Sequence, residues 1–208
     1  GELVRLGASL REILGQHFYP APVAALLGES LAASVLLSST IKFAGSLSLQ
    51  AKSEGPVSIL FGECTHDRQI RGYARVADGA VGGGLGELLS RGTLAITITP
   101  AEGQRYQGIV PLDATRLAGC LEHYFAQSEQ LPTAILLACD GEHAAGLLLQ
   151  ALPTSAEAVA DQAARWERLH RLACTVSDAE LLGEGFETLL YHLFHEERVR
   201  VQASEPVR

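Results

Sequence analysis

The spacing of apolar and polar residues first predicts two helices. Ser9 and Glu12 have the spacing of a capping box, in which each side chain bonds the other's free backbone amide. Apolar residues recur at helical spacing in this segment, at Leu10, Ile13 and Leu14. The run 22–39 is apolar on most sides, which is typical of a buried core helix. It is nearly long enough to span a membrane, but Glu29 in its middle would be costly in lipid, so we expect no membrane segment.

The hydrophobic period then changes from that of a helix to that of a strand. Alternating runs at 45–52, 55–63 and 69–77 are separated by turn signals, which predicts an antiparallel meander. Two hairpins follow, at 93–112 and 134–153. This order of elements predicts an α+β fold whose largely antiparallel sheets are covered by helices.

A helix is expected between the two hairpins. Asp113 or Thr115 can start it, and its apolar face carries Leu117, Cys120, Leu121, Tyr124 and Phe125. The stretch YFAQSEQLPT, 124–133, ends it, because Pro132 cannot continue a helix. Ser128 beside Glu129 leaves open a hydrolase-like site, but no histidine adjoins them in sequence. The closing of a helix end accounts for both polar residues, and we favour it over catalysis.

From residue 154 the chain predicts a helical arm. Thr154 with Glu157, and Ser177 with Glu180, have capping-box spacing. The segment 155–174 has a thin apolar stripe made of Val159, Ala163, Trp166 and Leu169. A later segment, 186–198, has an apolar face as well. Such short amphipathic helices are stable only when they dock on something.

We therefore divide the chain into a core domain, 1–153, and a helical linker region, 154–208. The apolar residues of the linker are candidates for binding a partner or for docking the linker on the core. These residues are Trp166, Leu181, Leu182, Phe186, Leu189, Leu190, Leu193 and Phe194.

Composition narrows the classes of function. The net charge is −8 and only two lysines are present, so we expect no nucleic-acid binding. The glycine-rich loop 78–92 lacks the lysine and hydroxyl of a phosphate loop. His192 and His195 lie three residues apart on an apolar helix, which favours solvated histidines over metal ligands. The spacing thus predicts no catalytic and no metal-binding residue.

The four cysteines are widely spaced, with no CxxC or CxC pair, at Cys64, Cys120, Cys139 and Cys174. Free thiols in a chain of 208 residues fit a reducing cytoplasm, so we expect a cytoplasmic protein. The chain contains no methionine, and Val199 and Val201 alternate near its end as if a strand were starting. We therefore interpret the sequence as a fragment.

Several motifs together resemble one family. The runs QHFYPAPVAALLGESLAASVLLSSTIKF, QIRGYARV, ITITPAEGQRYQGIVPL and YFAQSEQLPT, with the late LLYHLFHEERVRV, resemble the thirty-three kilodalton heat-shock proteins. These are redox-regulated holdase chaperones of bacteria. The resemblance covers nearly the whole chain.

The resemblance implies an ATP-independent stress-response chaperone that binds unfolded client proteins as a homodimer. It also implies a C-terminal zinc domain with CxC and CxxC cysteines, whose oxidation releases zinc and loosens the linker. Those cysteines are absent here, so zinc is expected only in that missing domain and no cofactor in this fragment. Two alternatives stay open: the hydrolase-like enzyme, and a dimerisation module that binds no client.

Overall fold

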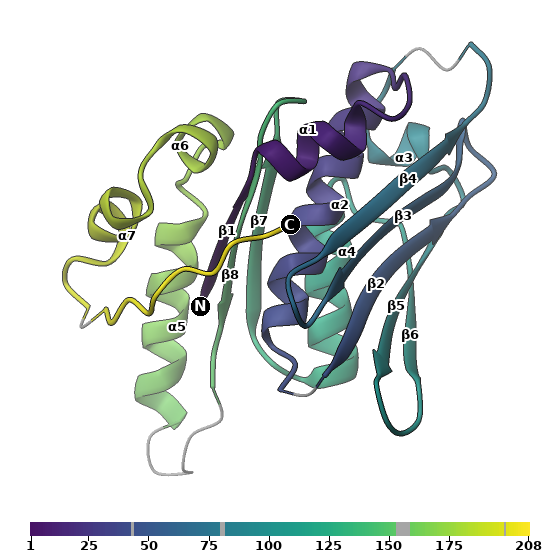
Figure 1. Cartoon of the computed structure of the whole chain (residues 1–208). Coiled ribbons are helices and arrows are strands. Elements are labelled where there is room, and N and C mark those ends of the chain that lie inside the picture. Colours follow the sequence, from purple (N-terminus) through teal and green to yellow (C-terminus); the bar gives the residue numbers. More distant parts are fainter. Residues whose placement is uncertain (43, 80–81, 153–158, 198) are drawn as a thin grey trace.

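In the computed structural model, residues 1–42, 44–79, 82–152, 159–197 and 199–208 are described, and they form four layers (Figure 1). A five-stranded sheet forms one side of the molecule, and helices α1, α2 and α4 pack on it. A three-stranded sheet covers the other side of these helices, and helices α5, α6 and α7 cover the outer face of that sheet. The antiparallel sheets and their helices make an α+β fold, as the sequence predicts.

The large sheet has the strand order β4-β3-β2-β5-β6, all antiparallel. Its strands are β2 (Gly45–Lys52), β3 (Val57–Thr65), β4 (Ile70–Val76), β5 (Thr93–Pro100) and β6 (Tyr106–Pro111). The predicted meander β2–β3–β4 and the predicted hairpin β5–β6 are confirmed. They belong to one sheet, because β5 pairs with β2 from Gly45 opposite Pro100 to Lys52 opposite Thr93. A short helix, α3 (Leu85–Leu88), leads into β5.

The small sheet has the order β1-β8-β7, also antiparallel. Its strands are β1 (Glu2–Leu6), β7 (Thr133–Cys139) and β8 (Ala144–Gln150). The second predicted hairpin, β7–β8, is confirmed. Strand β1 was not predicted, because five residues at the start of the chain are too few to show a period.

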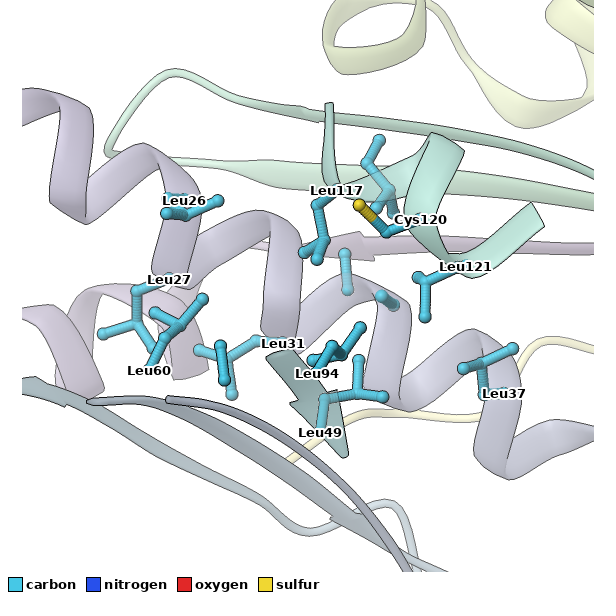
Figure 2. Packing of buried hydrophobic residues seen from close by; sticks show 14 of the residues in the cluster. Leu26, Leu27, Leu31, Leu37, Leu49, Leu60, Leu94, Leu117, Cys120 and Leu121 are labelled. Atoms are coloured by element: carbon cyan, nitrogen blue, oxygen red, sulfur yellow. The ribbon is translucent and has the colours of Figure 1, made fainter. Parts of the chain in front are cut away.

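The central layer is built on α2 (Ala21–Ser39), which is buried on nearly all sides, as predicted from the sequence. Figure 2 shows its leucines between the large sheet and helix α4 (Leu117–Tyr124). Of the residues that the structure describes, α2 is the only helix long and apolar enough to cross a membrane, and 72% of that stretch is buried inside the protein. This burial is what a core helix of a soluble protein requires.

Two predicted helix starts are wrong. Helix α1 (Ala8–Leu14) begins after Gly7, which places Ser9 inside the helix, where it cannot act as the N-cap. Helix α4 begins after the extended residue Arg116, later than the predicted start at Asp113 or Thr115. Its predicted apolar face is confirmed as buried. The helix ends in a wide turn, η1 (Phe125–Glu129), followed by a left-handed Gln130.

The remaining helices are α5 (Val159–Ala173), α6 (Asp178–Gly183) and α7 (Phe186–Phe194), which we call the arm. The capping box of Ser177 and Glu180 is confirmed at the start of α6. The box proposed for Thr154 and Glu157 lies outside the described residues. Residues 199–208 form no strand, contrary to the alternation of Val199 and Val201, and cross back to the core, where the Arg208 backbone bonds Arg68 and Ile70.

Candidate functional site

The candidate site is the outer face of the small sheet, which is apolar and is covered by the arm. Side chains alternate along each strand, so one set faces α2 and the other faces the arm. The register places Leu3 opposite Leu147, and Leu147 opposite Leu136. We call the apolar set that faces the arm the covered sheet face: Leu3, Leu136, Ala138, Ala145, Leu147 and Leu149.

The arm packs on this face as a separate apolar cluster. Five arm residues are at most 8% exposed, namely Ala173, Leu181, Leu189, Leu193 and Phe194. Leu182 and Leu190 are partly buried in the same cluster. The main core, on the other side of the small sheet, shares no buried residue with this cluster among the residues described. The arm therefore packs on the sheet as a cluster of its own, apart from the main core.

The two remaining candidates from the sequence are not members of this cluster. Phe186 is partly buried, with the Arg5 guanidinium 5.0 Å above its ring. Trp166 lines an open groove of about 630 Å³ between α5 and the end of α4, next to His170 and Leu131. Ala163, which the sequence placed on the apolar stripe, is exposed.

Sequence reasoning named arm residues that pack in this cluster but not the sheet residues. A signal was present in β8, whose sequence AAGLLLQ is apolar at successive positions. Such a run is typical of a strand buried on both faces. The hairpin could thus have been recognised as a strand pair with a second covering layer.

Ion pairs add polar contacts at the edge of this site. Within the arm region, Arg165 and Arg168 pair with Glu196 and Glu197, which tie α5 to the segment after α7. Arg116 of the core pairs with Asp178 of α6, with 2.7 Å between Nη2 and Oδ2. Both side chains of that last pair are 57% exposed, so the pair contributes little to docking.

The structure places Ser128 and Glu129 in the turn η1 at the end of α4. The Tyr124 hydroxyl donates to Glu129 Oε1 at 3.0 Å, which fixes the carboxylate at the helix end. Neither residue lines the groove beside Trp166. Desolvation by burial is the largest cause that raises the pKa of the Tyr124 hydroxyl, so this hydroxyl stays protonated and unsuited to act as a base.

The cysteines present do not fit a zinc site. Cys64 and Cys120 are buried in the main core, whereas Cys174 is exposed on the arm. Burial raises the pKa of the Cys139 thiol to about 11, which disfavours the thiolate that zinc requires. In the described parts of the chain, no three His, Cys, Asp or Glu side chains are placed to hold a metal ion. No step of the function is therefore assigned to zinc in this chain.

Comparison with known proteins gives one consistent result. The family model described as Hsp33 protein matches residues 1–208. The 33 kDa chaperonins of Pseudomonas paraeruginosa and Azotobacter vinelandii are 51% and 52% identical to this chain. Each alignment covers 100% of this chain and 71% of the relative.

A solved structure supports the same fold. The crystal structure of the 33 kDa chaperonin from Thermotoga maritima superposes with a TM-score of 0.77. It is 18% identical in sequence, and the match covers 98% of this chain and 73% of that chain.

Proposed function

The chain belongs to the Hsp33 family, whose relatives named 33 kDa chaperonin support a chaperone function, and we propose that it is an ATP-independent holdase that binds unfolded proteins on the covered sheet face. The observation that carries the proposal is an apolar sheet face covered by an arm whose packing is separate from the main core. Unfolded clients offer apolar side chains without fixed shape, so an apolar surface is what they can bind.

The arm acts as the cover of this surface. Its apolar residues dock it on the sheet in the closed state, and its release presents the covered sheet face to a client. Segments with few buried contacts to the core open locally at lower cost than the core itself unfolds. A chaperone of this kind needs no bound nucleotide and catalyses no reaction. We therefore propose that this chain is not an enzyme.

The finer properties follow the family resemblance. In the intact protein, a zinc and cysteine switch outside this chain would control the arm under oxidative stress. The active form would be a cytoplasmic homodimer that does not bind nucleic acid. The domain boundary between 1–153 and 154–208 stays a prediction.

The experiment is an aggregation assay with a heat-denatured enzyme whose light scattering is followed with and without this chain. We expect this chain to suppress scattering without ATP and without an oxidant. Equal scattering with and without it, in both the reduced and the oxidised state, would contradict the proposal.

A sedimentation experiment tests the rival class. A dimerisation module would sediment at the same rate whether or not reduced and carboxymethylated α-lactalbumin, a permanently unfolded chain, is added. A holdase would co-sediment with that probe.

A further inference from the structure

One polar side chain crosses from the small sheet into the arm. Arg5 lies on β1 between Val4 and Leu6, whose side chains belong to the main core. Alternation therefore places Arg5 on the opposite side, facing the arm, where it pairs across the sheet with Ala145. An arginine in this position interrupts an otherwise apolar face.

The arginine contacts the joint between two arm helices. Its Nη2 donates to the Leu181 carbonyl at 2.9 Å and to the Glu184 carbonyl at 2.5 Å. Its guanidinium lies 5.0 Å from the centre of the Phe186 ring, at the first residue of α7. One side chain of the core thus holds the end of α6 and the start of α7 together.

The end of a helix favours a cationic hydrogen-bond donor such as arginine at this position. The last carbonyls of a helix have no partner within the helix, and their partial negative charge favours a cation. Arg5 supplies both the donors and the charge. When the arm leaves the sheet, the hydrogen bonds of the guanidinium to the Leu181 and Glu184 carbonyls break together.

The contact is also incompletely satisfied, which limits its strength. The Nε of Arg5 is buried and has no hydrogen-bond partner in the described structure. Glu184 Oε2 is buried as well, and its neighbour His192 Nδ1, at 3.2 Å, carries a charge only when protonated. Desolvation of a charged group without full pairing offsets part of the gain from its bonds. Such a contact favours the docked arm but still allows the arm to leave the sheet.

We propose that Arg5 is the latch that holds the joint of α6 and α7 on the covered sheet face, and that it sets how readily the arm opens. The proposal rests on the proposed function for its consequence, which is control of client access. It assigns a regulatory role to a core residue 176 positions away from Leu181 in sequence. A second core-to-arm pair, Arg116 with Asp178, is exposed and serves as the matched comparison.

The experiment compares hydrogen exchange of the arm in the unmodified chain and in Arg5→Leu, Arg5→Lys and Arg116→Ala. Leucine keeps an apolar side chain on β1, so the sheet is retained. We expect the amides of α6 and α7 to exchange about a hundredfold faster in Arg5→Leu, since two charge-assisted hydrogen bonds are lost. Arg5→Lys keeps the charge and restores part of the protection, and Arg116→Ala changes exchange less than about threefold.

Hydrogen exchange and client binding together distinguish the role of Arg5 from the proposed client site. Amides of α2 report the main core and are expected to exchange equally in all variants. Unchanged or slower arm exchange in Arg5→Leu would overturn the latch, because apolar packing alone would then hold the arm. Faster arm exchange without tighter binding of carboxymethylated α-lactalbumin would support the latch and refute the covered sheet face as the client site.

Discussion

Weakening the docking of α7 should turn the chain into a more active chaperone. Leu189 and Leu193 are 2% and 8% exposed, lie one turn apart, and both pack in the cluster between the arm and the small sheet. The perturbation is the double change Leu189→Ala with Leu193→Ala. It deletes apolar volume from the cover and leaves every residue of the covered sheet face in place.

The magnitude follows from the burial of the two leucines. A buried Leu→Ala change costs about 2–5 kcal/mol, and neighbouring sites add less than fully. We therefore expect the docking free energy of the arm to fall by about 4–6 kcal/mol, which is comparable with the whole stability of many small domains. The main core lies on the other side of the small sheet, so its free energy of unfolding should change by less than about 1 kcal/mol.

The assay combines limited proteolysis of the arm with aggregation suppression at equal molar ratios. We expect earlier cleavage between α5 and α7, and stronger suppression of a heat-denatured enzyme. Tyr191→Ala is the matched control, because Tyr191 lies on the same helix and is 68% exposed. It should leave both readouts as they are in the unmodified chain.

Two results would refute the reasoning. If the arm is cleaved faster but aggregation suppression falls, the leucines themselves bind the client and the sheet face does not. If cleavage of the arm is unchanged, the arm is not held by this cluster. The charged pair Leu189→Glu with Leu193→Glu should release the arm in the same direction, with a larger effect.

Three further predictions concern the core. Burial, opposed by Arg116, raises the pKa of Glu29 from 4.5 to about 7, so the folded chain keeps a proton that the unfolded chain releases, and stability falls as pH rises between these values. Glu29→Gln should therefore raise the free energy of unfolding at pH 8 by about 2 kcal/mol and have little effect near pH 4.5, as urea titration at both pH values would show; equal effects would contradict this. Gly28→Ala would place a Cβ 2.3 Å from Cys139 Sγ, so overpacking should lower the free energy of unfolding by about 1–3 kcal/mol and lower the thermal midpoint. Gly86→Ala, with open space around it, should not destabilise the chain. Equal melting curves of the two variants would argue against the contact. Ser128→Ala should leave aggregation suppression unchanged and shift stability by less than about 0.5 kcal/mol, and a loss of activity would revive the hydrolase-like alternative.

Local patterns predicted much of the fold. The run 22–39 gave a buried helix, and the two hairpins appeared where alternating runs flank turn residues. The capping box at Ser177 was also correct, because it needs only residues within one helical turn. The same kind of signal misled at Ser9, where the helix begins after Gly7.

The sequence predicted the arm side of the candidate site but not the sheet side. The arm supplied Leu181, Leu189 and Leu193 from an amphipathic period that any docked helix shows. Its target was not predictable in the same way. An amphipathic face reveals that it must be covered but not by what, because hydrophobic contact is not directional.

By itself, the sequence determined the helices and hairpins, the apolar arm and the family resemblance, since these depend on neighbours a few residues apart. Only the tertiary structure decided the pairing of β2 with β5, the place of β1 beside β8, and the contact of Arg5 with α6. These contacts join segments that are far apart in the chain. Their free energy comes from burial and hydrogen bonds that exist only after the chain has closed on itself, so no local pattern records them.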